Sequence, residues 1–417
     1  MHAPLAAAAG RTASPATARL INDRLALRLL QSEGPLTAGQ LKKLTGLSRP
    51  TVADLVDRLQ EAGLVAVVGE SGAQRRGPNA RLYGIVADRA HLLGLDLRTH
   101  SLTVAVADLL GQVRAERTVP VDPPGAAGTT AAALAGALAG ALAGALATID
   151  GTLAEAGAAA PHALAIGAPG LVDPVTGRLG GSAPAWHDAL IDALRDRGTG
   201  TLLLENEVNL AALAEQRDGA ARDRDTFVLL WLGHGTGAAV VLDGAVRRGA
   251  SGGAGEIGFL PVPGTGGLPS ATGCDGGFHS LAGSAAIGRL AAEHGRAPTA
   301  ADDGPARTEA PPAEALVRDA VAEGAGGAAF LDALAARIAL GVAGVCAVLD
   351  PGCVVLGGEI GRAGGDPLAG RVADHLARLS PLRTEVRAGT VGGRAVLRGA
   401  VLAARDAAQD DLFGAAG

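Results

Sequence analysis

The first apolar pattern in the chain has the spacing of an amphipathic helix. It covers residues 20–32, and a Gly-Pro pair ends it. The leucines that this spacing turns inward are Leu20, Leu25, Leu29 and Leu30. A shorter helix over residues 38–45 follows and is expected to bury Leu41 and Leu44.

A third helix follows the second after a glycine turn. Thr37 and Gln40 have the spacing of a capping box for the helix over 38–45. Gly46 then makes the turn, and Ser48 is the expected N-cap of a helix that runs to Gly63. Its apolar stripe consists of Val52, Leu55, Val56 and Leu59. Two short helices around a glycine turn predict a helix-turn-helix.

Two alternating segments, 64–70 and 80–86, predict a β-hairpin wing after the helices. We therefore expect a disordered tail over 1–17 and a winged helix-turn-helix domain over 18–90. The DNA-binding residues expected there lie at the helix starts and on the wing: Thr37, Gln40, Ser48, Arg49, Pro50, Thr51, Arg58, Arg75, Arg76 and Arg81.

Charge separates this part of the chain from the rest. Residues 1–90 hold 12 Lys and Arg against 7 Asp and Glu, a net charge of +5, while the remainder carries −11. A basic head on an acidic body is typical of a polyanion-binding module joined to another domain. A basic helical dimerisation domain remains the alternative interpretation of the head. Lys42 and Lys43 fit phosphate contact and plain solvated surface equally well.

From residue 91 the pattern changes to alternating strands and helices, which indicates an α/β domain. Strands are expected at 92–96, 101–108, 113–119, 163–167, 202–205, 227–232, 238–243 and 353–356, and helices at 208–217 and 328–349. The uncharged segment 129–148 has Leu134, Leu138, Leu142 and Leu146 on one face, so we interpret it as a soluble helix packed on a sheet and not as a membrane span.

Several ordered motifs resemble the ROK family of repressors, open reading frames and sugar kinases, in its winged-helix regulator branch. They are GLSRPTVADLVDRLQEAGLV at 46–65, GLDLRTHSLTVAVADLLGQV at 94–113, IGAPGLVDPVTGRL at 166–179, LENEVNLAALAEQRDGA at 204–220, GHGTGAAVVLDGAVRRGASGGAGEIG at 233–258 and LDPGCVVLGGEIG at 349–361. The resemblance implies an actin-like ATPase fold over 91–410, with two α/β lobes around a sugar-binding cleft, behind the winged head.

The kinase motifs that the resemblance implies are altered in this chain. The family's first phosphate loop keeps its Asp at Asp96, but Arg98 and Thr99 stand where the family has two glycines. The glycines of the second loop remain as Gly233, Gly235 and Gly237, although a hairpin turn explains them equally well. Glu207 stands at the position of the catalytic Asp; one extra methylene disturbs that geometry, so we expect no catalytic residue.

The family's zinc and sugar ligands are also reduced. Only Cys274 remains of the zinc loop, and His279 stands where the family has a sugar-binding Glu. We expect no metal and no cofactor, and the altered first phosphate loop argues against ATP binding. The residues expected to bind an effector are Asn206, Glu207, Asn209, Glu256 and His279. Trp186 fits either ligand stacking or a core position.

The sequence therefore predicts a cytoplasmic DNA-binding regulator, a repressor of carbohydrate-related genes that binds a double-stranded operator as a homodimer or homotetramer. Its body would sense a sugar or sugar phosphate. One alternative is an ATP-dependent sugar kinase with an accessory DNA-binding head. Another is a regulator whose body only dimerises. Three scattered cysteines agree with a reducing compartment.

Overall fold

The computed structural model describes residues 15–71, 80–121, 131–180, 184–198, 200–270, 273–297 and 311–414. The chain divides into two compact units. The head unit comprises Met1–Leu92, Ala107–Gln112 and Arg405–Gly417, and the body unit comprises Leu93–Val106 and Val113–Ala404.

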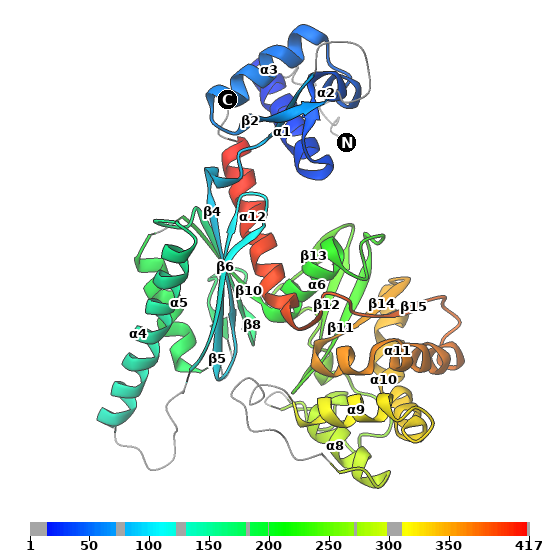
Figure 1. The fold of residues 1–417 in the computed structure, drawn as a ribbon. Coiled ribbons are helices and arrows are strands. Elements are labelled where there is room, and N and C mark those ends of the chain that lie inside the picture. The colour runs from blue at the N-terminus through cyan, green and yellow to red at the C-terminus, as the bar shows by residue number, and fades with distance from the viewer. Residues whose placement is uncertain are drawn as a thin grey trace, which may run out of the picture. The chain divides into compact units, whose positions relative to one another are not determined.

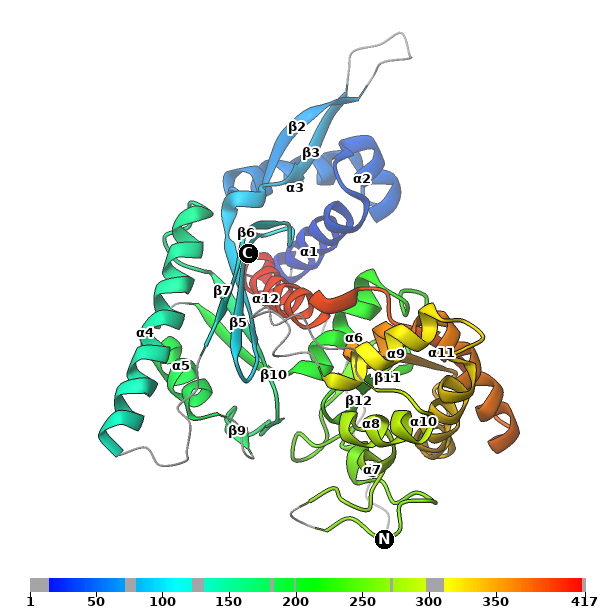
Figure 2. The same cartoon turned by 60° about the horizontal axis from the view of Figure 1, so that its bottom comes forward.

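The head unit has the predicted helices and hairpin. Its elements are α1 (Pro15–Glu33), β1 (Leu36–Thr37), α2 (Ala38–Thr45), α3 (Arg49–Glu61), β2 (Val65–Ser71), β3 (Ala80–Ile85) and a 3₁₀ turn at Ala87–Arg89. The strands form an antiparallel sheet in the order β1-β3-β2, with β2 and β3 as a hairpin beside α3 (Figure 2). The helix begins three residues before the expected domain start, so Pro15–Thr17 do not belong to a tail.

Two predicted core leucines of the head are exposed. Leu25 is 39% exposed and Leu44 is 49% exposed, whereas Leu41 and the whole predicted stripe of α3 are buried. Leu30 is buried as predicted, and it shares the buried face of α1 with Asp23, Ala26 and Leu27. The leucine pattern did not reveal this face fully, because a charged residue, Asp23, occupies one of its inward positions.

A buried ion pair explains how Asp23 is accommodated. The Asp23 side chain is 1% exposed, and Arg58 Nη2 of α3 lies 2.6 Å from its Oδ1 atom. Arg58 also donates to Asp54, one turn earlier on α3. This pair joins α1 to α3 through charge-assisted hydrogen bonds inside the head unit.

The C-terminal residues also belong to the head unit, which the sequence did not predict. The side-chain amide of Gln409 donates to Gln31 Oε1 and to the carbonyl of Leu109, both at 2.9 Å. Arg24 donates to the carbonyl of Asp410. The predicted boundary at residue 90 is therefore incomplete, because helix α12 (Ala395–Gly414) has its last turns in the head unit and its first in the body unit.

The first lobe of the body unit is built on a five-stranded sheet in the order β10-β7-β4-β5-β6. Its elements are β4 (His91–Leu97), β5 (Ser101–Asp108), β6 (Val113–Pro120), α4 (Ala131–Glu155), β7 (Ala163–Ala168), β8 (Leu171–Val172), β9 (Leu179–Gly180), α5 (Ala185–Asp196) and β10 (Thr201–Asn206). Figure 1 shows α4 and α5 together beside this sheet. β10 pairs with β7 in parallel, as in α/β proteins.

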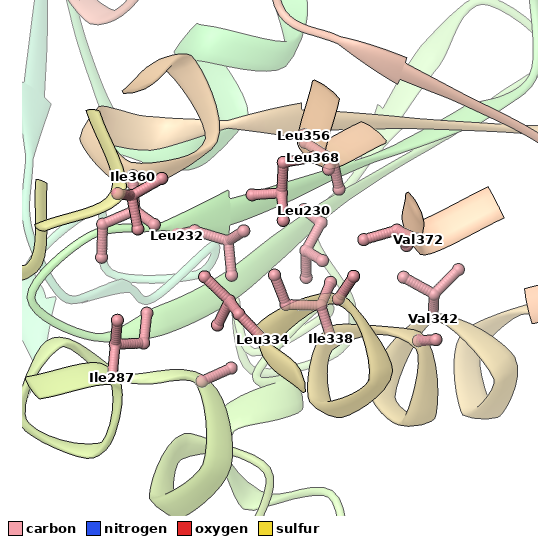
Figure 3. Close-up of a cluster of buried hydrophobic side chains, with 14 of the residues drawn as sticks. Leu230, Leu232, Ile287, Leu334, Ile338, Val342, Leu356, Ile360, Leu368 and Val372 are labelled. Atoms are coloured by element: carbon pink, nitrogen blue, oxygen red, sulfur yellow. The ribbon is translucent and has the colours of Figure 1, made fainter. Parts of the chain in front are cut away.

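The second lobe has a five-stranded sheet in the order β13-β12-β11-β14-β15. Its elements are α6 (Glu207–Asp218), β11 (Phe227–Leu232), β12 (Thr236–Leu242), β13 (Ala245–Arg247), a 3₁₀ turn at Ile257–Phe259, α7 (His279–Ala282), α8 (Ser284–Glu293), α9 (Pro312–Ala322), α10 (Ala328–Leu349), β14 (Cys353–Gly357), α11 (Gly358–Leu379), β15 (Glu385–Ala388) and a 3₁₀ turn at Gly392–Arg394. Leucine, isoleucine and valine side chains from β11, α10 and α11 form its core (Figure 3). Both lobes confirm the predicted α/β class.

Two helices of the body unit, α4 and α10, are long and apolar enough to cross a membrane by length and hydropathy alone. α10 lies in the core of the second lobe. On α4, Leu138, Leu142 and Leu146 pack against the first lobe, whereas Leu134 is 41% exposed. The predicted leucine face therefore holds for three of its four positions.

We predict that Arg58→Ala destabilises the head, because it leaves the buried Asp23 carboxylate without its partner. Breaking a buried ion pair on one side costs about 3 kcal/mol, and hydrogen exchange of the α1 and α3 amides in the full chain measures this opening free energy. The matched control is Asp54→Ala, which removes the exposed partner of the same arginine and should cost less than about 1 kcal/mol. Equal effects of the two substitutions would contradict this role for Arg58.

Candidate functional site

The leading turn of α3 presents polar and basic groups to solvent. Ser48 caps the helix by accepting from the backbone N–H of Thr51, and the two hydroxyl groups lie 2.7 Å apart. Arg49 is exposed and makes no ion pair with another described residue. An unpaired guanidinium on a leading turn is available for a phosphate or for the acceptor edge of guanine.

The other residues predicted to bind DNA have varied surroundings. Pro50 and Arg81 are exposed. Thr37 and Gln40 form the predicted capping box, in which Thr37 N–H donates to Gln40 Oε1 at 2.9 Å. Arg58 is held by Asp23 and Asp54, so we remove it from the proposed DNA contacts. The predicted wing contacts, Arg75 and Arg76, lie outside the described residues.

Charge changes along α3. Arg49 opens the helix, whereas the exposed residues of its later turns include Asp54, Asp57 and Glu61. Carboxylates repel a phosphate backbone, so the electrostatics favour DNA contact at the N-terminal turn only. Lys42 and Lys43 on α2 are both exposed and extend the basic surface.

The body unit contains a cavity of about 520 Å³. The lining residues lie near the ends of strands, in the adjoining loops and in the first turns of α6 and α11: Arg98, Thr99, His100, Pro169, Gly170, Asn206, Glu207, Val208, Trp231, His234, Gly235, Thr236, Gly237, Glu256 and Glu359. The carboxyl ends of strands are where open α/β sheets bind ligands. Both lobes contribute, so this cavity is the cleft of the body unit.

Arg98 connects the lobes at one side of the cleft. It follows β4, and its Nε lies 3.2 Å from Asp96 Oδ1 on the same strand. Its Nη1 lies 2.7 Å from Glu359 Oε1, at the start of α11 in the second lobe. The carboxylates of Asp96 and Glu359 raise the pKa of Arg98, so its guanidinium stays charged and fixed. Asp96 itself is buried beneath it and does not line the cleft.

A buried histidine supports the backbone of Arg98. His187 is 0% exposed, and its Nε2 lies 2.9 Å from the Arg98 carbonyl oxygen, to which it donates. Burial lowers the pKa of His187, so the neutral imidazole is favoured. Trp186 is also 0% exposed and contacts the His187 ring edge-on, which confirms its core position.

The Asn-Glu-Val-Asn motif is divided between scaffold and cleft. Asn206 caps α6, accepting from Val208 N–H, and its amide donates to the Gly170 carbonyl at 2.9 Å. Asn206 and Glu207 both line the cleft. Asn209 is 4% exposed and donates to Glu205 instead, so it does not reach the cavity.

The glycines of the loop between β11 and β12 differ in how closely they are packed. A Cβ atom at Gly233 would lie 2.8 Å from Glu359 Oε2 and 2.8 Å from Trp231 Nε1, so packing accounts for this glycine. Gly235 and Gly237 line the cleft and have room for a Cβ atom. Gly235 and Gly237 are therefore compatible both with a hairpin turn and with a phosphate-binding loop.

Glu256 lines the cleft, whereas His279 does not. His279 lies behind the glycine loop, 3.9 Å from a Cβ built on Gly235. Among the described residues no cluster of His, Cys, Asp or Glu could hold a metal ion. The loop that resembles a zinc loop offers one thiol, Cys274, so its residues do not fit tetrahedral zinc.

Sequence reasoning missed several cleft residues. Glu359 and Trp231 line the cavity. Glu205 is only 7% exposed and precedes the lining residue Asn206. Its carboxylate lies 2.5 Å from Arg248 Nε. Their place in the sequence could have indicated them. Trp231 and Glu359 lie near the ends of β11 and β14, where an α/β sheet presents side chains to a ligand.

Comparisons with known proteins agree with this architecture. The ROK family model matches residues 92–407, and the model described as the MarR family matches residues 21–77. The chain is 27% identical over 248 residues to the DNA-binding transcriptional dual regulator NagC of Escherichia coli K12, a match that covers 58% of this chain and only 57% of that relative.

Two further relatives represent both branches of the family. A solved ROK family transcriptional regulator, described as a homolog of the E. coli MLC protein, superposes with a TM-score of 0.71 at 22% identity, covering 95% of this chain and 98% of the other. A glucokinase of Halalkalibacterium halodurans is 29% identical over 242 residues, covering 56% of this chain and 72% of the enzyme. With a family model that spans most of its length, a MarR-type winged helix and an actin-like body, the chain belongs to the ROK family.

Proposed function

We propose that the protein is a transcriptional regulator that binds a double-stranded operator through its head unit and represses carbohydrate-related genes. The observation that carries the proposal is the leading turn of α3, where Arg49 is exposed and unpaired beside the Ser48 cap. The similarity to NagC supports it. A regulator of this kind would act in the cytoplasm, where it would meet its operator DNA.

A ligand in the cleft is the second part of the proposal. The cavity of about 520 Å³ fits a molecule of sugar size, and a sugar or sugar phosphate is the effector class that the family suggests. A ligand changes DNA binding only if it favours one arrangement of the protein over another. A homodimer or homotetramer would bind operator half-sites about one helical turn, or a multiple of it, apart.

The remaining candidate is an ATP-dependent sugar kinase. Glu207 and the glycines Gly235 and Gly237 in the cleft favour it, as does the similarity to a glucokinase. Against it stands Arg98, which occupies a position where the family has a glycine for ATP phosphates and which is held there by ion pairs with Asp96 and Glu359. We therefore propose that the protein is not an enzyme.

We predict that Arg49→Ala weakens operator binding and lowers the salt slope of log K by about 1, because one phosphate contact is lost. If Arg49 contacts a base instead, about 1–3 kcal/mol of sequence discrimination is lost at that position. The measurement is fluorescence anisotropy with an operator selected from random DNA. Arg289→Ala, which removes an exposed arginine of α8 in the body unit, is the matched control. Loss of affinity in the control alone, or in neither variant, would count against the proposed interface.

A coupled assay of ATP consumption over a panel of sugars tests the kinase alternative. We predict no turnover above background, because phosphates cannot approach the backbone around Arg98. Glu207→Gln is the diagnostic variant, since it removes the only group at the family's catalytic position. Sustained turnover that Glu207→Gln abolishes would establish the kinase and refute the proposal.

A further inference from the structure

The cleft is rich in carboxylates. Glu207, Glu256 and Glu359 all line it, and Asp96 lies just beneath. Among the described residues that line the cavity, Arg98 alone carries a guanidinium or ammonium group. The remaining polar lining consists of imidazole, hydroxyl, amide and backbone groups, which bind hydroxyl groups of a ligand well.

The charge of Arg98 is already compensated. Its guanidinium has carboxylate partners on two sides, at 3.2 Å from Asp96 and 2.7 Å from Glu359. A ligand anion could engage the guanidinium fully only by displacing one of these carboxylates, while the His187 hydrogen bond to the carbonyl oxygen of Arg98 fixes the backbone at this position. A phosphate entering the cleft would have to replace Glu359 and would then face the other carboxylates, a repulsion that is strong where water is partly excluded.

Glu256 is the carboxylate available to form an ion pair with a ligand. It lines the cavity, and its side-chain carboxylate makes no hydrogen bond or ion pair with another described residue. The position before it requires glycine, because Gly255 has a φ of 93° and a Cβ atom on it would lie 1.9 Å from the Ala238 carbonyl oxygen. Desolvation raises the pKa of Glu256, so a nearby positive charge would stabilise its ionised form.

An apolar wall completes the environment. Trp231 is 9% exposed and lines the cavity with Pro169 and Val208. Such a wall suits the C–H face of a sugar ring, while its hydroxyl groups turn toward the polar lining.

We propose that the cleft, taken as the effector site of the function proposed above, binds an amino sugar through a protonated amine and disfavours phosphorylated sugars and nucleotides. The amine pairs with the Glu256 carboxylate. The ring packs on Trp231, and the pair of Arg98 and Glu359 closes the side of the cleft where a phosphate would otherwise be placed.

Isothermal titration calorimetry with the full chain at about pH 7 tests this selectivity. The probes are 2-amino-2-deoxy hexoses, their parent hexoses and the parent 6-phosphates, each in the gluco, galacto and manno configurations. In at least one configuration the amino sugar should bind about fivefold tighter than its parent, because an ammonium–carboxylate ion pair replaces a hydroxyl–carboxylate hydrogen bond. The 6-phosphate should bind more weakly than the parent. Tighter binding by the 6-phosphate, equal binding by the parent, or no binding by any amino sugar would overturn the proposal.

Variants separate the specific contact from general electrostatics. Glu256→Gln should remove the advantage of the amino sugar, so that the amino sugar and its parent hexose bind this variant with affinities within about twofold of each other. Asp366→Asn, which removes an exposed carboxylate of α11 outside the cleft, should leave both affinities unchanged. A preserved amine preference in Glu256→Gln would show that Glu256 is not the partner.

Operator binding measured on the same preparations distinguishes this inference from the proposed function. A chain that binds its operator but prefers a neutral or phosphorylated sugar refutes the amine selectivity and leaves the regulator intact. A chain that prefers amino sugars but binds no DNA supports the selectivity and refutes the regulator.

Discussion

The guanidinium group of Arg98 lies between two carboxylates that belong to different sheets of the body unit. Asp96 comes from the first lobe and Glu359 from the second, so one side chain joins both walls of the cleft. The interaction has two consequences. It fixes the cleft at the end where ATP phosphates would approach a glycine loop, and it neutralises the single cation of the described cavity lining. What remains is a polar, acidic pocket suited to recognition of a ligand.

The head unit depends on a comparable interaction. Asp23 and Arg58 form a charged contact inside the helical core, and this contact sets the orientation of α1 against α3. Because Arg58 is paired there, the exposed basic groups proposed to contact DNA among the described residues include Arg49, Arg81 and the lysines of α2. The last turns of α12 belong to the same unit through Gln409, so residues far apart in the sequence build the head together.

The fold was predictable from the sequence because its signals are local. The Ser48 cap, the Thr37 capping box and the period of α3 each specify an element without tertiary information. The full buried face of α1 was not predictable, since Asp23 is buried only because a distant arginine pairs with it. The cleft was predictable in part: Glu207 and Glu256 were expected, whereas Glu359 depends on how a second lobe packs against Arg98.

The central claim is the proposal that a ligand in the cleft of the ROK body controls a DNA-binding head. The most direct measurement is the affinity of the full chain for its selected operator, by anisotropy, without ligand and with a saturating concentration of the tightest-binding amino sugar. The account predicts that the ligand changes the operator dissociation constant by about 5- to 150-fold, the range typical of coupled sites. An operator affinity that the bound ligand leaves unchanged, or no specific operator at all, would contradict it.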